Sequence, residues 1–378
     1  MNIDQLNTPC LILNEEKLSN NIERVRNRLN EKALIFRPHM KTAKCIEVGR
    51  RMMKSPQGPI AVSTLKEAEK FAEAGVLDIL YAVGIAPSKL EAVSALRSRG
   101  IDLSIVIDSV SQAEAVAARA RLDRDPIPVL IEIDADGSRG GVRFDASEKV
   151  LTIARELHAG GAELRGVLTY SGATYECRDV DEIRAVAERE RQAAVHSAGL
   201  LRNAGFPCPI VSVGSTPTAS FSENFADITE VRAGVFAFSD LVMAGLGVCS
   251  VEDIALSVLA SVIGHSHDGH RILVDAGWMA VSRDRGTASQ RVDQGYGVIC
   301  DLDGEIIPDL IMSAASQEHG ILSLRSGSRV SLPNLPIGSM VRILPNHACA
   351  TAAQHQRYHV VSTGSHVLSD VWERFSGW

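Results

Sequence analysis

The feature that most constrains the fold is an alternation of strand-like and helix-like segments along the first two-thirds of the chain. Apolar runs bounded by turn residues alternate with segments of helical spacing such as TLKEAEKFAEAG and DEIRAVAERERQAAVHSAGLLRNAG. Strands that alternate with helices pair in parallel through right-handed crossovers, and eight repeats in about 200 residues predict a closed (β/α)8 TIM-type barrel of the α/β class. The eight strand candidates are ALIFRPHMKT, GPIAVST, DILYAVG, DLSIVID, PVLIEIDAD, RGVLTYSG, PIVSVGST and DITEVRAG.

A doubly wound open sheet is the structural alternative to a barrel. Such a sheet normally has fewer strands and would need a nucleotide-binding loop after its first strand. No GxGxxG motif follows the first strand candidate, so the sequence favours the barrel.

The pattern changes after about residue 245, where strand-like runs follow one another without amphipathic helices between them. These runs are SVLASVIGHS, RILVDAGWMAVS, YGVICDL, SMVRILPNHACAT and YHVVSTG. The sequence therefore predicts a barrel domain at residues 12–245 and a mainly β domain at residues 246–378. The N-terminal segment 1–11 leads into the strand-like run TPCLILN, and we expect it to join the second domain.

Composition excludes several classes of function. The net charge is -7 and the basic residues are scattered, so nucleic-acid binding is not expected. No segment approaches the ~20 apolar residues that cross a bilayer, and the N-terminus lacks the pattern of a secretory signal, so we expect a cytoplasmic protein without a membrane partner. The seven cysteines are widely spaced and form no CxxC pair, which indicates free thiols in a reducing compartment.

Catalytic groups of a parallel barrel lie where its strands end, and the first strand candidate ends with the residues RPHMKT. A lysine that faces the apolar interior there, Lys41, would be desolvated, which lowers the pKa of its amine and favours imine formation with an aldehyde. Taken alone, a lysine at such a position is more often a surface or ion-paired residue.

The seventh and eighth strand candidates end in small and hydroxylated residues. VSVGSTPT contains Gly214, Ser215 and Thr216, and EVRAGV contains Gly234. Hydroxyl and backbone N–H groups after strands seven and eight fit the phosphate site that barrels often build there. An ordinary turn is the alternative for each cluster taken singly.

Strands five and six supply further candidates for contacts with a planar, anionic ligand. Arg139 in DADGSRGG could hold a phenolate or carboxylate oxygen, or could simply pair with Asp134 or Asp136. Tyr170 and Tyr175 in TYSGATYE could lie beside a ring or donate to a phosphate, although such a pair is more often part of the packing.

A candidate metal site lies in the second domain, in the segment PNHACAT. His347 and Cys349 alternate in a strand-like run, so both side chains would point to one face. Imidazole and thiolate are ligands that Zn²⁺ prefers, and two ligands would leave positions open for water or substrate. A buried histidine beside a buried cysteine is the structural alternative. The nearby cluster 317–319, QEHG in sequence, has no role that the sequence assigns.

Four of these motifs occur in order over nearly the whole chain: RPHMKT, VSVGSTPT, EVRAG and PNHACAT. With this combination the chain resembles the D-serine dehydratase and D-threonine aldolase family of pyridoxal-phosphate enzymes, which have an alanine-racemase-like barrel. The resemblance implies that Lys41 carries the cofactor as a Schiff base. It places Tyr175, Thr216, Gly234 and Val235 at the cofactor, Val235 through its backbone N–H.

The same resemblance carries over Arg139 and Tyr170 as further cofactor contacts, and His347 and Cys349 as the metal site beside the substrate. Members of the family are commonly dimers, so a homodimer is expected. The aldolase branch tends to have an aspartate where this chain has Cys349. Thiolate is a soft ligand, so the cysteine favours the dehydratase branch and favours Zn²⁺ over Mn²⁺, with Co²⁺ as a further possibility.

The expected activity is therefore a pyridoxal-phosphate- and metal-dependent lyase that removes water from D-3-hydroxy amino acids. D-serine or D-threo-3-hydroxyaspartate would give a 2-oxo acid and ammonia. Retro-aldol cleavage of D-threonine is the nearest alternative. A racemase would need a second acid or base and no metal, and a non-catalytic cofactor-binding protein would not need the second domain.

Overall fold

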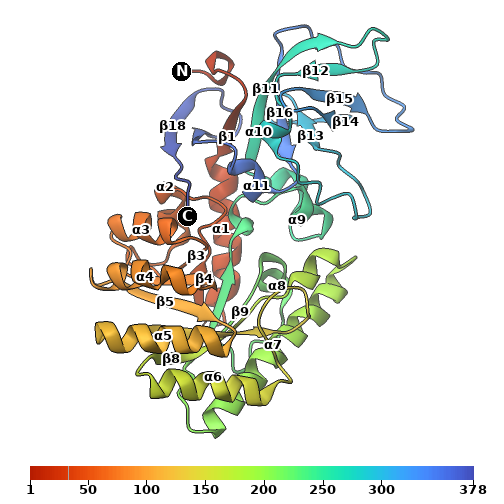
Figure 1. Ribbon diagram of the computed structural model, residues 1–378. Coiled ribbons are helices and arrows are strands. Elements are labelled where there is room, and N and C mark those ends of the chain that lie inside the picture. The colour runs from red at the N-terminus through yellow and green to blue at the C-terminus, as the bar shows by residue number, and fades with distance from the viewer. Residues whose placement is uncertain (33) are drawn as a thin grey trace. The chain divides into compact units, whose positions relative to one another are not determined.

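The computed structural model describes residues 1–32 and 34–378. The chain divides into two compact units (Figure 1), one made of Arg24–Gly234 with Ser376–Trp378, the other of Met1–Glu23 with Val235–Phe375. We call them the barrel unit and the sheet unit. The expected domain ranges of 12–245 and 246–378 stay predictions.

The barrel unit is built on a parallel sheet. In the described residues, eight strands hydrogen-bond in the order β2-β10-β9-β8-β6-β5-β4-β3, and the short β7 pairs with β6. Their bounds are β2 (Ile35–Pro38), β3 (Ile60–Val62), β4 (Asp78–Gly84), β5 (Asp102–Ile107), β6 (Pro128–Asp134), β7 (Val142–Arg143), β8 (Glu163–Thr169), β9 (Ile210–Val213) and β10 (Glu230–Ala233).

The two ends of this sheet meet, which makes it a barrel. His39, directly after β2, forms a parallel bridge with Ala61 of β3, and the Met40 N–H donates to the Ala61 carbonyl at 2.8 Å. Each of the eight sequence runs overlaps one of the eight strands, so the predicted barrel is confirmed. Ala33, the first residue of the first run, lies outside the described residues.

Helices follow the strands and cover the outside of the barrel (Figure 1). Several begin at a polar cap residue: the side-chain oxygens of Thr64, Ser109 and Asp179 each accept an N–H of the first helical turn. Such caps contribute about 1 kcal/mol each and fix where a helix starts. The helices are α1 (Glu15–Asn30), which the division between the units crosses, α2 (Ile46–Met52), α3 (Leu65–Glu73), α4 (Leu90–Arg97), α5 (Val110–Asp123), α6 (Ser147–Ala159), α7 (Val180–Asn203) and α8 (Thr216–Phe221).

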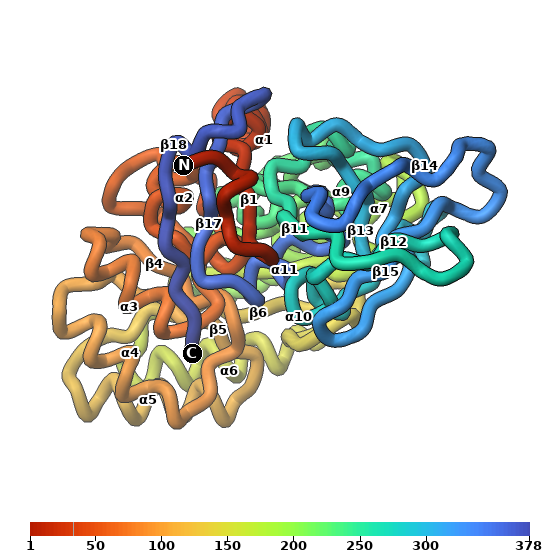
Figure 2. The backbone as a smooth tube through the Cα atoms, turned by 90° about the horizontal axis from the view of Figure 1, so that it is seen from above, coloured from red at the N-terminus to blue at the C-terminus, as the bar shows by residue number. Residues whose placement is uncertain are grey.

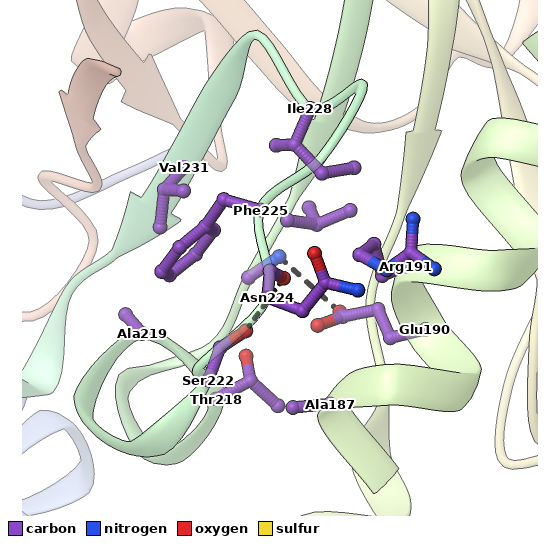
Figure 3. Close-up of a pocket in the computed structure, with 12 residues that line it drawn as sticks. Ala187, Glu190, Arg191, Thr218, Ala219, Ser222, Asn224, Phe225, Ile228 and Val231 are labelled. Carbon is purple, nitrogen blue, oxygen red and sulfur yellow. Dashed lines mark hydrogen bonds between the residues drawn. The ribbon is translucent and has the colours of Figure 1, made fainter. Parts of the chain in front are cut away.

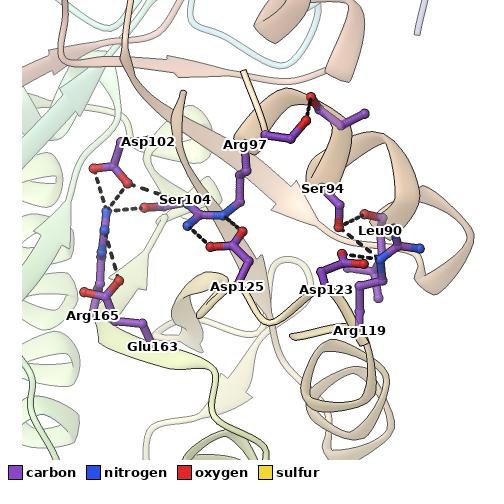
Figure 4. Close-up of polar contacts among 12 residues, drawn as sticks. Leu90, Ser94, Arg97, Asp102, Ser104, Arg119, Asp123, Asp125, Glu163 and Arg165 are labelled. Carbon is purple, nitrogen blue, oxygen red and sulfur yellow. Dashed lines mark hydrogen bonds and ion pairs between the residues drawn. The ribbon is translucent and has the colours of Figure 1, made fainter. Parts of the chain in front are cut away.

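Ion pairs gather where barrel strands begin (Figure 4). Arg165 contacts Asp102 at 2.8 Å and Glu163 at 3.0 Å, and Asp102 and Glu163 are the first residues of β5 and β8. Arg97 pairs with Asp125 ahead of β6. Partly exposed pairs contribute little each. Their position shows that charge at the N-terminal ends serves the scaffold, whereas the C-terminal ends are where barrels place chemistry.

The sheet unit is mainly antiparallel, as the sequence predicts. Its strands run in the order β12-β15-β14-β13-β16-β11-β1-β17-β18, and β12 also pairs with β11, which closes the first six into a ring. The N-terminal β1 lies between β11 and β17 and is parallel to β17 (Figure 2). The bounds are β1 (Cys10–Asn14), β11 (Leu256–His265), β12 (Ile272–Val274), β13 (Gly297–Cys300), β14 (Ile306–Ala315), β15 (Gly320–Leu324), β16 (Met340–Pro345), β17 (Arg357–Val361) and β18 (Leu368–Glu373).

Three short helices lie between these strands: α9 (Leu241–Gly245), α10 (Trp278–Val281) and α11 (Ala348–Ala352). A hydrophobic cluster joins the first of them to the sheet through Leu241, Ile254, Val298, Cys300 and Leu344. The helix α11 begins directly after β16, and this connection positions the candidate metal ligands.

Candidate active site

Lys41 lies just after β2, where the barrel closes. Its backbone N–H donates to His39 Nδ1 at 3.3 Å, and the His39 N–H donates to the Ala233 carbonyl of β10 at 2.7 Å. The Lys41 side chain is exposed, so the expectation of a lysine desolvated by the barrel interior is wrong. The reason is positional, because the strand ends at Pro38 and Lys41 has already left the packed sheet.

Positive charge converges on this side of the barrel. Burial lowers the pKa of His39 well below its usual value, and Lys41, Arg232, Arg139 and Lys44 lower it further in that order. Burial and the surrounding positive charges together therefore keep His39 neutral at physiological pH. A region with four nearby cations suits an anionic ligand that carries a phosphate or a phenolate.

Glycines in the turn after β9 and at the end of β10 let neighbouring backbone segments approach each other closely. Gly214 has φ +126°, and a Cβ there would lie 2.3 Å from the Arg232 carbonyl oxygen. A Cβ on Gly234 would lie 3.1 Å from the His39 carbonyl oxygen. Both glycines thus bring strand ends together at the mouth of the barrel, which a larger residue would push apart.

Ser215 and Thr216 form the start of α8. The Ser215 side chain accepts from the Thr218 N–H at 3.3 Å, and the Ser215 N–H donates to Thr218 Oγ1 at 2.8 Å. The groups of Ser215 are thus engaged inside the turn, which gives it a structural role in shaping the loop. Thr216 is the first residue of the helix and is buried.

Arg139, Tyr170 and Tyr175 line one pocket of the barrel unit, with a volume of about 470 Å³. The Arg139 guanidinium lies 4.2 Å from the centre of the Tyr170 ring, a cation–π contact. The two loops that carry these residues are joined, because Asp136 accepts the Ala173 N–H at 3.0 Å. The structure therefore brings Arg139 to the two tyrosines, from which it is more than thirty positions away in the sequence.

A buried charged network that sequence reasoning missed lies among the barrel strands. Arg232 donates to Ser212 Oγ at 2.5 Å and to the Thr169 carbonyl at 2.6 Å. Glu230 accepts from Ser212 and from Arg37, each at 2.6 Å. Burial lowers the pKa of Arg232, and Glu230 and other carboxylates oppose that effect. The signal was present in EVRAG, where charged residues occupy a strand that is buried throughout.

Polar atoms without partners mark the end of β8. In the part of the chain that the structure describes, Thr169 Oγ1 and Ser171 Oγ are buried and have no hydrogen-bond partner. Buried hydroxyls are normally satisfied, so unpaired ones beside Tyr170 fit a site built for a polar ligand. With the four cations and the two glycines, they match the requirements of a phosphorylated aromatic cofactor.

Glu190 of α7 supports the two loops that surround this region. Its Oε1 accepts the N–H of Ser171 at 3.1 Å and the N–H of Gly214 at 3.2 Å. Figure 3 shows Glu190 directed into a small cavity beside α8 that Thr218 and Asn224 also line. Burial raises the pKa of Glu190 to about 7, against the charge of Arg232 and its hydrogen bonds. No sequence pattern revealed this residue, because its partners are 19 and 24 positions away.

The raised pKa of Glu190 predicts a pH-dependent effect of Glu190→Gln. The folded-state pKa of about 7 lies above the ordinary 4.5, so the stability linked to this group is complete below about pH 4.5 and is lost as the pH rises through 7. Glutamine does not ionise, so the variant should gain stability relative to the wild type between about pH 5 and pH 8, by at most roughly 3 kcal/mol. Urea unfolding at several pH values measures this difference.

Glu188→Gln on the same helix is the matched control. A hydrogen bond from Arg191 lowers the pKa of Glu188, so its carboxylate is ionised in both states across this range. The control should differ from the wild type by a constant amount. If the Glu190→Gln difference is also constant with pH, Glu190 does not titrate as described.

The sheet unit holds the two candidate metal ligands, but not as the sequence predicted. PNHACAT is not one extended strand: β16 ends at Pro345, His347 is the N-cap of α11, and Cys349 lies in the first turn. The alanine-rich sequence that follows His347 favours a helix over a strand. Because the cap residue is extended, with φ −134°, its side chain remains within hydrogen-bond reach of Cys349.

His347 has an acidic partner that the sequence did not reveal. Its Nδ1 lies 2.6 Å from Asp284 Oδ2. Burial alone would lower the pKa of His347, but the hydrogen bonds with Asp284 and Cys349 outweigh it and raise the pKa to about 11. In the described residues no group of three or more His, Cys, Asp or Glu side chains could hold a metal, so His347 and Cys349 form a two-ligand candidate.

The cluster 317–319 lies in the connection between β14 and β15 and is exposed. Gln317 donates to Glu318 at 3.3 Å, and the Ser316 N–H donates to the His319 carbonyl at 2.8 Å. These contacts are local to the hairpin. They assign no catalytic role to the cluster.

A closed parallel barrel with a cationic mouth, together with a mainly antiparallel sheet unit, defines the alanine-racemase-like class of proteins. Residues 13–241 match the alanine racemase N-terminal domain, and residues 255–361 match the serine dehydratase domain. The chain belongs to the family that combines these two domains, and the resemblance found in the sequence is confirmed. The structure contains no helix long and apolar enough to span a membrane among the residues it describes.

Three relatives match along almost the full chain. D-threo-3-hydroxyaspartate dehydratase of Delftia sp. (strain HT23) is 48% identical, covering 99% of this chain and 98% of its own length. D-serine dehydratase of Dictyostelium discoideum is 29% identical, covering 97% and 96%. D-threonine aldolase of Arthrobacter sp. is 28% identical, covering 98% and 92%. The first two are dehydratases, which are lyases.

The Delftia enzyme is also similar in structure, with a TM-score of 0.96 at 47% identity and 100% of both chains covered. Its solved structures include a histidine-to-alanine mutant and a cysteine-to-alanine mutant in the metal-free form. The two substituted positions are two residues apart in that chain.

Proposed function

We propose that this protein is a pyridoxal-phosphate- and metal-dependent dehydratase that removes water from a D-3-hydroxy amino acid. D-threo-3-hydroxyaspartate or D-serine would give a 2-oxo acid and ammonia. The observation that carries the proposal is 48% identity with D-threo-3-hydroxyaspartate dehydratase over 99% of the chain. The match covers 99% of the chain, so it extends through both units.

The residues of the barrel mouth fit pyridoxal phosphate. The cofactor contacts we propose are Lys41, Arg139, Tyr170, Tyr175, Ser215, Thr216, Gly234 and Val235. Support comes from the cations around His39, from the unpaired hydroxyls of Thr169 and Ser171, and from the close approach that Gly214 and Gly234 permit. When bound, the cofactor supplies an electron sink that stabilises negative charge at the substrate Cα.

Lys41 has a second proposed role, which is to remove the proton from Cα. An amine at the barrel mouth can exchange protons with a substrate bound there, and a positioned acid or base typically contributes ~10²–10⁴-fold to a rate. The Arg139 guanidinium offers several N–H donors, so it can hold a carboxylate or phenolate oxygen. Its stacking on Tyr170 orients that charge.

His347 and Cys349 are proposed to bind the divalent metal. The paired histidine and cysteine mutants of the Delftia enzyme, one of them in a metal-free form, support this assignment through their matching two-residue spacing. The thiolate favours Zn²⁺ over the harder Mn²⁺, and Co²⁺ is a workable substitute. A metal there supplies Lewis acidity for the departure of the β-hydroxyl group, since hydroxide is a poor leaving group. We further propose that the protein acts as a homodimer.

A turnover panel tests the proposed activity. The purified protein, supplied with pyridoxal phosphate and Zn²⁺, is incubated with D-serine, both diastereomers of D-3-hydroxyaspartate and D-threonine, and ammonia and aldehyde are both measured. Ammonia with an equal amount of 2-oxo acid is the expected result. The L-enantiomers are the matched controls and should release neither product.

Two other outcomes would contradict the proposal. Release of aldehyde and glycine would indicate an aldolase. This alternative is considered because the chain is 28% identical to D-threonine aldolase. Absence of turnover on every substrate, with pyridoxal phosphate still bound, would indicate a cofactor-binding protein.

A further inference from the structure

The contact between Asp284 and His347 sets the metal site apart from an isolated His–Cys pair. The Asp284 carboxylate reaches Nδ1 of the ring at 2.6 Å, so one ring nitrogen is already occupied. The other nitrogen, Nε2, is then the one that can bind a metal. Carboxylates that hold the second nitrogen of a metal-bound histidine fix its tautomer and orientation and increase its basicity.

Residues on both sides of His347 are anchored through their side chains to the segment that carries Asp284. Asn346 accepts from Thr287 Oγ1 at 2.7 Å and donates to the Gly295 carbonyl at 2.6 Å. On the other side, Thr351 Oγ1 donates to the Val281 carbonyl at 2.7 Å. These hydrogen bonds lie on both sides of the contact between His347 and Asp284, so they hold the two side chains in position relative to each other.

Asp284 itself is presented by an unusual turn. Ser282 has φ +75°, in the left-handed region that non-glycine residues rarely adopt, and its side-chain oxygen accepts the Asp284 N–H at 3.1 Å. Holding a residue in that region costs about 1–3 kcal/mol, which the surrounding bonds offset. The turn places the partly exposed carboxylate against His347.

We infer that Asp284 is a positioning residue for the metal site, holding His347 so that Nε2 and the Cys349 thiolate bind one divalent ion. This inference rests on the proposed function, because it assumes that His347 and Cys349 are the ligands. Asp284 does not touch the metal itself. It acts by removing the rotational freedom of the ring and by stabilising the tautomer that ligates.

The test measures metal binding directly, without turnover. Zn²⁺ affinity is determined by competition with a chromophoric chelator on the cofactor-loaded full chain for the wild type, Asp284→Ala, Asp284→Asn and His347→Ala. Asp284→Ala should bind Zn²⁺ about 10–100-fold more weakly, as is typical for loss of such a partner. Asp284→Asn keeps the shape and an acceptor oxygen but loses the charge, so a smaller loss is expected. In Co²⁺-loaded protein, the visible spectrum should also change in Asp284→Ala, because the ring is no longer held.

Asp303→Asn is the matched control. Asp303 contacts His366 Nε2 at 2.9 Å in the same unit, so this variant removes a similar carboxylate–imidazole pair outside the proposed metal site. Its Zn²⁺ affinity and Co²⁺ spectrum should equal those of the wild type. The visible absorbance of the bound cofactor should be the same in all variants.

The outcomes separate the inference from the function on which it rests. Wild-type Zn²⁺ affinity in Asp284→Ala, together with loss of binding in His347→Ala, would overturn the positioning role and leave the ligands in place. Wild-type affinity in His347→Ala would overturn the ligand assignment itself. If Asp284→Ala does not fold, the isosteric variant Asp284→Asn is used to test the inference. A wild-type Zn²⁺ affinity and a wild-type Co²⁺ spectrum in Asp284→Asn would then overturn it.

Discussion

Lys41→Ala is expected to remove both the visible absorbance of lysine-bound pyridoxal phosphate and the dehydration of D-3-hydroxy amino acids. The amine is the proposed covalent attachment point and the proposed base at Cα, so one substitution eliminates two roles. Loss of the base that removes the Cα proton predicts by itself a fall of about 10²–10⁴-fold in kcat. Loss of the covalent attachment of the cofactor should lower kcat further. Absorbance of the reconstituted protein and ammonia release measure the two effects.

Lys70→Ala provides the control for this substitution. Lys70 lies on α3, outside the proposed cofactor site, and its ammonium contacts Glu73 at 2.8 Å, so it is engaged in an ion pair. We expect the variant to keep the cofactor band. Borohydride reduction followed by peptide mapping identifies the attached lysine, and a label on any residue other than Lys41 would contradict the assignment.

The barrel could be predicted from sequence because its signal is local and repeated. Each strand candidate is a short apolar run beside turn residues, and each capping residue, such as Thr64 or Asp179, lies next to the helix it starts. Parallel pairing then follows from the alternation itself. The position of Lys41 at a strand end was also accessible in this way, although its exposure was not.

The residues that support the site could not be predicted, because their partners are distant in sequence. Asp284 and His347 are 63 positions apart, and Glu190 meets Gly214 across 24. Asp and Glu are common surface residues, so nothing in their local sequence distinguishes these two. The helical form of the segment after His347 was missed for another reason: a five-residue helix gives too short a pattern to separate from a strand.

The two units differ in how they provide charge. The barrel mouth surrounds His39 with lysines and arginines, whereas the environment of His347 contains Asp284, Asp240 and Cys349. An anionic cofactor and a divalent cation would each be attracted to one of these regions and repelled by the other. This division agrees with a reaction that needs an electron sink at Cα and an acid at the β-hydroxyl group.

His347→Ala and Cys349→Ala are expected to lose the metal while retaining the cofactor. With only one ligand left, neither variant should hold Zn²⁺ through dialysis, whereas the absorbance of bound pyridoxal phosphate should equal that of the wild type. Lewis-acid catalysis is worth several kcal/mol, and each 1.36 kcal/mol is tenfold in rate. Dehydration should therefore fall on the order of 10²–10⁴-fold. Metal content and ammonia release are the measurements.

Chelator-treated wild type and Cys177→Ala complete the comparison. Cys177 is partly exposed, as Cys349 is, and it lies outside the proposed metal site, so its variant should keep both metal and activity. The demetallated wild type should lose dehydration and regain it when Zn²⁺ is added back, whereas the two ligand variants should not respond. Full activity in demetallated wild type would show that the β-hydroxyl leaves without a metal. The acid would then have to be a protein group.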